Sequence, residues 1–126
     1  MKNPKDLYYT ENHEWVRVDE NHAYIGITAH AQTELGEIVY VEMPEPDKEI
    51  ESGEEVLTIE SLKAASPVYA PVSGSIVEIN EELEDAPDLL NEDPYENHIF
   101  VVEMNNPEEV EHLLSVGEYE DFLKEA

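Results

Sequence analysis

Cysteine is absent from the 126 residues of this sequence. The absence excludes a disulfide, a thiolate nucleophile and a cysteine-built metal site. Any sulfur chemistry must therefore come from a bound group. Glycine is also scarce, with five residues, and none stands in a pattern that cradles phosphates, so a nucleotide site is not expected.

Basic residues are few, with 6 Lys and Arg against 32 Asp and Glu, for a net charge of −26. This balance excludes nucleic acid and anionic membrane surfaces as partners, because both need basic residues. No apolar run approaches the roughly 20 residues that span a bilayer. The start, residues 1–6, has no apolar core after it and is not a secretory signal. We expect a cytoplasmic protein, and the like charge favours a monomer.

The acidity itself has three interpretations. It can be a solvated surface that keeps the protein soluble, which is the usual case. It can steer the protein toward partners with basic docking faces. It can also reflect a salt-rich cytoplasm, in which counter-ions screen the self-repulsion.

The length and the 40% apolar content predict one compact domain. Its core is expected at about residues 13–103, followed by a helical segment at about 106–125. Strands rich in β-formers are expected within the core. Their ranges are 13–18 and 22–27, which form a hairpin, and 37–41, 54–60, 75–79 and 98–103, with an extended segment at 67–71 and an acidic loop at 80–97.

Helix signals are fewer. Thr28 can cap a short helix over residues 29–35, which Gly36 would end. In the tail, Asn106 is expected as an N-cap before Pro107 and Glu109. Two apolar stripes at helical spacing follow, and we expect Gly117 to interrupt the helix between them. The stripes predict core packing by Val110, Leu113 and Leu114, and then by Tyr119, Phe122 and Leu123.

A short pattern occurs twice. Residues 36–41 and 74–79 both read Gly-x-Ile-Val-x-aliphatic, and each precedes an acidic, proline-bearing stretch and another strand. The echo predicts two similar half-sheets related by a pseudo-twofold axis. Residues 61–66 would link the halves.

Lys63 lies in that link, with small neighbours and a strand expected on each side. A lone exposed lysine is usually a solubilising charge. A lysine at the tip of a hairpin between two half-sheets also suits the attachment of a swinging arm. Such an arm needs an exposed lysine on a fixed base, with no bulky side chains that crowd it. The pKa of the lysine does not have to be shifted.

Signatures of catalysis and metal binding are missing. The five histidines have no metal-ligand spacing, and no Ser–His–Asp pattern occurs. We interpret His13 and His30 as structural. The sequence therefore predicts no metal and no catalytic residues, and a protein that is not itself an enzyme.

Several stretches, taken in order and spacing, closely resemble the glycine cleavage system H protein family. The resemblance runs from about Leu7 to near the C-terminus. The matching stretches are His13-Glu14-Trp15-Val16, Ile25-Gly26-Ile27-Thr28, His30-Ala31-Gln32, Leu35-Gly36-Glu37-Ile38-Val39, Glu60-Ser61-Leu62-Lys63-Ala64, Tyr69-Ala70-Pro71-Val72-Ser73-Gly74, Leu90-Asn91 and Pro94-Tyr95.

The resemblance implies a mostly β fold, a hybrid barrel-sandwich as in lipoyl domains, with a short internal helix and C-terminal helices. It implies that Lys63 carries lipoate in amide linkage, which would supply the missing sulfur. The flanks of this attachment motif are Glu60, Ser61, Leu62 and Ala64.

The implied function is a shuttle in glycine catabolism. In the family, a PLP-dependent glycine decarboxylase loads an aminomethyl group onto the arm. An aminomethyltransferase passes the one-carbon unit to tetrahydrofolate, and dihydrolipoamide dehydrogenase reoxidises the dithiol. A lipoate ligase or lipoyl transferase attaches the cofactor. Tethering raises the effective concentration of the arm at each enzyme.

The resemblance also implies a surface cleft that shelters the loaded arm. Glu14 matches an acidic side chain that helps to hold the amine, and carboxylate against ammonium is a sensible pair. Glu14 could instead be one more surface acid. Asn12 is a second candidate for this cleft and stands where relatives often have Ser, and Pro67 stands where they often have Asp. Residues 96–98 also depart from the family and leave the packing near the last strand open.

Three alternatives share the fold or the lysine. A lipoate relay, which would donate lipoyl groups to 2-oxo acid dehydrogenases, would use the same Lys63. A biotin carrier is disfavoured, because that family flanks its lysine with methionines, whereas Leu62 and Ala64 stand here. A purely structural module would need no arm at all.

Overall fold

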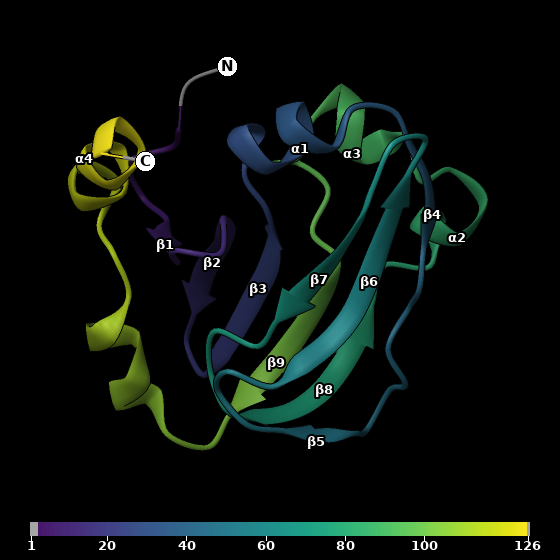
Figure 1. Cartoon of the computed structure of the whole chain (residues 1–126). Coiled ribbons are helices and arrows are strands. Elements are labelled where there is room, and N and C mark those ends of the chain that lie inside the picture. The colour runs from purple at the N-terminus through teal and green to yellow at the C-terminus, as the bar shows by residue number, and fades with distance from the viewer. Residues whose placement is uncertain (1–2, 126) are drawn as a thin grey trace.

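Two β-sheets pack face to face in the computed structural model, which describes residues 3–125 (Figure 1). The larger sheet has the order β1-β2-β3-β9-β8-β5, and the smaller has the order β4-β6-β7; every neighbouring pair is antiparallel. The strands of the larger sheet are β1 (Tyr8–Tyr9), β2 (Glu14–Asp19), β3 (His22–Ile27), β9 (Phe100–Met104), β8 (Gly74–Ile79) and β5 (Glu49–Ile50). Those of the smaller sheet are β4 (Ile38–Val41), β6 (Glu55–Ser61) and β7 (Ala65–Tyr69).

The core lies between the sheets. Inward-facing aliphatic and aromatic side chains from both sheets are fully buried there, among them Ile25, Ile59, Ile76 and Phe100. Each such side chain stabilises the fold by roughly 1.5–3 kcal/mol relative to an exposed position. The expected hairpin of β2 and β3 is present, with Glu14 opposite Ile27.

The internal helix α1 (Ala29–Leu35) forms as the sequence predicts. The Thr28 side chain accepts a hydrogen bond from the Ala31 amide, and Gly36 ends the helix at a φ of 74°. The expected acidic loop is wrong in part, because it contains the helical turns α2 (Glu82–Asp85) and α3 (Leu89–Glu92). Leu83 and Leu90 are fully buried, and their anchoring accounts for these turns among so many acids.

The C-terminal segment forms a 3-10 helix, η1 (Pro107–His112), and the helix α4 (Val116–Glu125). Gly117 lies inside α4 and does not interrupt it, so that expectation is wrong. Asn106 precedes η1 but makes no side-chain cap within the described residues. Glu109 instead accepts hydrogen bonds from the amide and hydroxyl of Ser73, at 2.6 and 2.8 Å, and ties η1 to the core.

Helix α4 packs through Tyr119, which is fully buried and stacks on Tyr9 with ring centroids 4.7 Å apart. Trp15 and Leu7 complete this smaller cluster, beside the six-stranded sheet. In residues 3–125, no helix is both long and apolar enough to cross a membrane.

The sequence echo has a structural counterpart. A bulge interrupts the β4–β6 pairing between Ile38 and Tyr40, and another interrupts the β8–β9 pairing between Ile76 and Glu78. These are equivalent positions of the repeated pattern, and the bulged residues, Val39 and Val77, are similarly exposed at 45% and 43%. The two half-sheets therefore share a local geometry as well as a sequence. The link between them is shorter than expected, because β7 already begins at Ala65.

Substituting Gly74 tests the strand contact beside this repeat. Gly74 has a φ of 155°, and an added Cβ would lie 2.0 Å from the carbonyl oxygen of Glu103. We expect Gly74→Ala to lower the free energy of unfolding by about 2–3 kcal/mol, measured by urea denaturation.

Gly117→Ala is the matched control, because an added Cβ there meets nothing within 4 Å among the described residues. It should leave the stability unchanged or raise it by about 0.5 kcal/mol, since Ala is the better helix former. Equal stability of Gly74→Ala and the wild type would contradict the close approach of β8 and β9.

Candidate functional site

Lys63 lies at the exposed tip of the β6–β7 hairpin, as the sequence predicts. Ser61 fixes this tip: its amide donates to the Ala64 carbonyl at 2.8 Å, and its hydroxyl accepts from the Ala64 amide at 3.1 Å. Leu62 is 73% exposed, and Lys63 is exposed as well. Glu60 is exposed at the end of β6, opposite Ala65. The tip is thus rigid at its base and open at its end.

The lysine stem rests on Gly36. A Cβ added at Gly36 would lie 3.3 Å from Lys63 Cε and 3.8 Å from Nζ. Because glycine has no side chain, the Lys63 stem can lie against the backbone at this position. The Leu62 amide donates to the Glu37 carbonyl at 3.0 Å, which joins the tip to the entry of β4. The base of the lysine is therefore held by the segment that follows α1.

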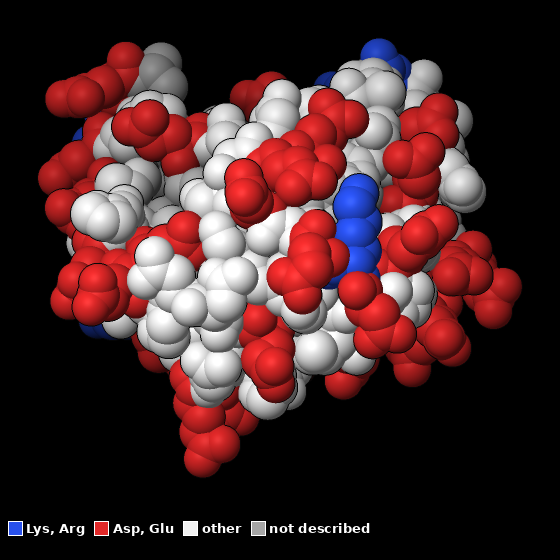
Figure 2. Space-filling view, turned by 90° about the horizontal axis from the view of Figure 1, so that it is seen from below, with Lys and Arg blue, Asp and Glu red and all other residues white. Residues whose placement is uncertain are grey.

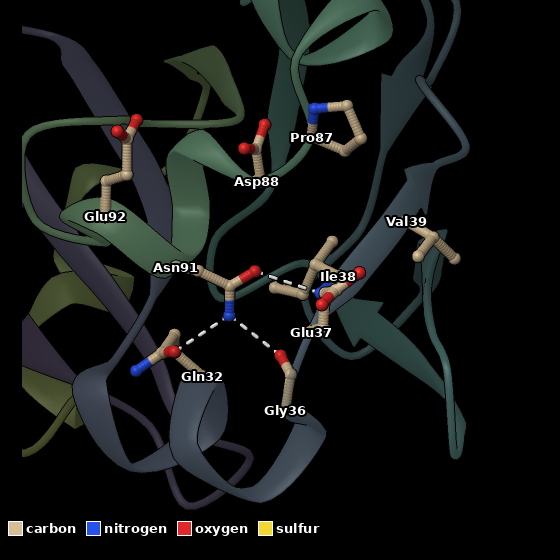
Figure 3. Close-up of a pocket in the computed structure, with 9 residues that line it drawn as sticks. All are labelled: Gln32, Gly36, Glu37, Ile38, Val39, Pro87, Asp88, Asn91 and Glu92. Atoms are coloured by element: carbon tan, nitrogen blue, oxygen red, sulfur yellow. Dashed lines mark hydrogen bonds between the residues drawn. The ribbon is translucent and has the colours of Figure 1, made fainter.

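A groove of about 810 Å³ lies alongside Gly36, between the end of α1, the start of β4 and α3 (Figure 3). Asn91 reaches across it. Its Oδ1 accepts from the Ile38 amide at 2.9 Å, and its Nδ2 donates to Gln32 Oε1 at 2.8 Å and to the Gly36 carbonyl at 2.7 Å. Asn91 therefore pins the segment that carries the lysine. No signal in the sequence indicated this role, because the partners of Asn91 lie more than fifty positions away.

A second cleft, of about 450 Å³, begins at Ala64 beside Lys63. It runs between α1 and β7 and reaches Asn12 and Glu14. Pro67 lines it on β7, so the position where relatives often have Asp offers no side-chain hydrogen bond here. The two residues proposed for an arm cleft are thus brought together in one cavity that opens next to the lysine.

Glu14 is buried, with 2% of its surface exposed, so the interpretation as one more surface acid is wrong. Its carboxyl oxygens accept hydrogen bonds from the Thr10 hydroxyl and from the Tyr69 amide, both at 2.8 Å. Burial raises the pKa of Glu14 to about 7, although both hydrogen bonds act to lower it. The group is a desolvated acceptor that would gain from a cationic partner.

His13 and His30, interpreted from the sequence as structural residues, both line the cleft. The ring centroids of His13 and His30 lie 4.4 Å apart, and His30 Nε2 is 3.5 Å from Glu34 Oε1. Their positions in the sequence, one before β2 and one in α1, gave no signal that the rings would meet. Over residues 3–125, no three acidic or histidine side chains gather as a metal site would require.

The departure from the family at residues 96–98 has a local explanation. The Asn97 side-chain amide donates to the carbonyls of Leu89 and Asp93, at 3.0 and 2.9 Å. It therefore closes the end of α3, the turn that carries Asn91. The packing that the sequence left open is fixed by these bonds and does not touch the lysine hairpin.

The raised pKa of Glu14 can be tested by titration. Its pKa in the folded protein, about 7, lies above the 4.5 that is usual for a glutamate. Between these pH values the folded protein keeps a proton that the unfolded chain has lost, so the stability contribution of Glu14 falls as the pH rises from about 4.5 to about 7. We expect a carbon-13 NMR midpoint near 7 for the Glu14 carboxyl.

Glu14→Gln assigns the NMR signal. The free energy of unfolding of this variant should change less with pH over the same window than that of the wild type. Glu34→Gln serves as the control, because the Glu34 side chain is 71% exposed. A Glu14 midpoint near 4 would contradict the burial of an unpaired carboxylate.

Comparisons with known proteins agree with one another. The family model described as Glycine cleavage H-protein matches residues 7–126. A glycine cleavage system H protein of Syntrophomonas wolfei is 60% identical over 98% of this chain and 95% of that protein. The H protein 4 of Aquifex aeolicus is 52% identical over 95% of this chain and 71% of that protein.

A solved structure gives the same result for the fold. A glycine cleavage system H protein from Mycobacterium marinum superposes with a TM-score of 0.89 at 32% identity, over 97% of this chain and 99% of that one. The lipoyl-domain-like barrel-sandwich is therefore confirmed. With a family model that spans nearly the whole sequence, this chain belongs to the glycine cleavage H-protein family, the lipoyl carriers of the glycine cleavage system.

Proposed function

We propose that the chain carries lipoate in amide linkage on Lys63 and works as the shuttle of the glycine cleavage system. The observation that supports this most is the placement of Lys63 at an open hairpin tip whose base is hydrogen-bonded on both sides. The chain has no cysteine, so the bound lipoate would supply the dithiol. That dithiol would carry the aminomethyl unit. The residues present suit it, because the stem lies over Gly36 and the hairpin tip is exposed.

The dimensions of the cleft match an arm of this kind. Ala64 and the β7 residues Ala65–Val68 line one side of it, a stretch that spans roughly 13 Å at about 3.3 Å per residue. An extended chain advances roughly 1.2 Å per bond, so an amide-linked eight-carbon acid reaches about 14 Å from the Lys63 Cα to its ring sulfur. An arm folded along β7 would therefore bring its end to the region of Glu14.

Glu14 is proposed to hold the amine of the cargo at that end. An ammonium beside the carboxylate would replace lost hydration with a charge-assisted hydrogen bond and lower the Glu14 pKa. Asn12, which lines the same cleft, is proposed as a second polar contact. The pairing is specific because Glu14 is desolvated, unlike the many acids on the surface.

The wider roles follow from the family. The partners within the system are the decarboxylase and the aminomethyltransferase. We further propose that dihydrolipoamide dehydrogenase reoxidises the arm, that a lipoate ligase or lipoyl transferase attaches it, and that the chain performs no bond chemistry with its own side chains. The acidic side chains scattered over the face in Figure 2 would attract basic docking faces on these enzymes.

We also propose a single carrier domain over residues 1–126, a monomer, and a place in the cytoplasm with the enzymes it serves. A lipoate relay to 2-oxo acid dehydrogenases is not favoured, since the matching proteins carry the name of the glycine cleavage system.

Replacing the lysine tests the attachment. Lys63→Arg should fold normally but gain no lipoyl mass when it is incubated with lipoate, ATP and a lipoate ligase. It should also be inactive in a reconstituted glycine cleavage assay. The measurement is intact mass followed by peptide mapping of residues around position 63.

Lys48→Arg is the matched control, because Lys48 is an exposed lysine that pairs with Glu54 at 3.7 Å, away from the hairpin tip. It should be lipoylated as fully as the wild type. Lipoylation or activity of Lys63→Arg would refute the assignment of the attachment site.

The role of Glu14 predicts a shorter lifetime for the loaded carrier. Glu14→Gln keeps the shape but loses the charge, so ammonia release from the loaded protein should be about tenfold faster, since hydrogen bonds to charged groups contribute about 1.5 kcal/mol or more. Glu34→Gln removes an exposed carboxylate from the same cleft and should change the rate little. Equal release rates for Glu14→Gln and wild type would show that Glu14 does not hold the amine.

A further inference from the structure

A chain of hydrogen bonds connects the C-terminal helix to the wall of the cleft. The Tyr119 hydroxyl on α4 lies 2.8 Å from Thr28 Oγ1 and 2.8 Å from His13 Nδ1. Thr28 Oγ1 also accepts from the Ala31 amide at 3.3 Å, as the cap of α1. The His13 ring lines the cleft, and its φ of 67° is the left-handed conformation that side chains other than glycine rarely adopt. Tyr119 on α4 thus links Thr28, the cap of α1, to His13 in the cleft, which has a strained backbone.

The number of hydroxyl hydrogens available determines which group donates in each of these hydrogen bonds. Thr28 is fully buried, and within residues 3–125 its hydroxyl has one acceptor, the Tyr119 oxygen. If Thr28 donates to Tyr119, the single hydroxyl hydrogen of Tyr119 is left for His13. His13 Nδ1 must then be an acceptor, and a neutral imidazole with an accepting Nδ1 carries its proton on Nε2. The opposite direction would leave the buried Thr28 hydrogen without a partner, which is unfavourable.

We propose that Tyr119 is a positioning residue that holds His13 neutral, with its proton on Nε2, and so keeps positive charge out of the cleft beside Glu14. The consequence for the cleft rests on the proposed function, whereas the tautomer of His13 does not. A cleft that binds an ammonium loses affinity if its own wall becomes cationic. Among the described residues that line it there is no Lys or Arg, so the two histidines are the groups that could carry such a charge.

Most of the groups around His13 also favour its neutral form. Burial lowers the pKa of His13, the neighbouring His30 lowers it further, and Glu34 on α1 raises it. From α4, Tyr119 and Phe122 face the ring, and Phe122 brings no charge. Glu14 is the adjacent residue in the chain and is itself desolvated. Geometry and environment therefore both favour the neutral ring.

The test is nitrogen-15 NMR of the imidazole rings in the full-length, unlipoylated protein, with the His13 signals assigned by His13→Asn. The wild type should show the pattern of a proton on Nε2 and an unprotonated Nδ1. In Tyr119→Phe the fixed tautomer should give way to a mixture, and the titration midpoint of His13 should rise by about one pH unit. Tyr95→Phe is the control, because the Tyr95 hydroxyl accepts from the Ala29 amide at 3.1 Å and does not join this chain.

A wild-type proton on Nδ1, or a His13 midpoint that Tyr119→Phe leaves in place, would overturn the assignment. A second readout uses the loaded carrier: its ammonia release should accelerate on acidification at a higher pH in Tyr119→Phe than in wild type. An identical pH profile would overturn the link to the cleft. Failure of lipoylation at Lys63 would leave the NMR result unaffected, so the two proposals can fail separately.

Discussion

One hydrogen bond joins the two sheets where the cleft ends. Glu14, the first residue of β2 in the larger sheet, accepts from the amide of Tyr69, the last residue of β7 in the smaller sheet. Because the carboxyl group is buried, this contact is formed in a low dielectric and fixes the distance between the strands. The cleft therefore has a closed end at Glu14 and an open end at the lysine hairpin.

The repeated half-sheets explain why the lysine lies at the open end. Each half has a strand with a bulge at the same position of the pattern, and the β6–β7 hairpin turns at residues 62–64, next to the point where Ser61 pairs with Ile38. Ser61 holds the turn, and Asn91 holds the neighbouring segment at Gly36 and Ile38. The Lys63 side chain therefore extends from a hydrogen-bonded base.

The sequence predicted the parts of the fold that depend on local signals. The β2–β3 hairpin, the cap of α1 at Thr28 and its end at Gly36 are all confirmed, since each depends on a few neighbouring residues. The exposed Lys63 follows from the same reasoning. The resemblance to the family supplied the fold and the arm cleft, which composition and periodicity alone could not.

Features that depend on tertiary contacts were missed. The turns α2 and α3 form because Leu83 and Leu90 find a core to enter, which a run of acids does not reveal. Asn106 looked like a cap, but Glu109 bonds to Ser73 instead, across more than thirty positions. The meeting of His13, Tyr119 and Thr28 joins three segments whose proximity only the folded chain shows.

Pro67 has a consequence for what the cleft can admit. The Tyr69 amide points to Glu14 and away from β6, and groups two residues apart on a strand point the same way, so the backbone nitrogen of Pro67 also lies on the unpaired edge of β7. That nitrogen carries no hydrogen, and the free edge of β7 therefore lacks a donor at its centre. An intruding peptide cannot add itself as a further strand along this edge, whereas a flexible aliphatic chain needs no backbone ladder to lie there. The proline thus disfavours β-strand addition along the edge of β7, where Pro67 lines the cleft.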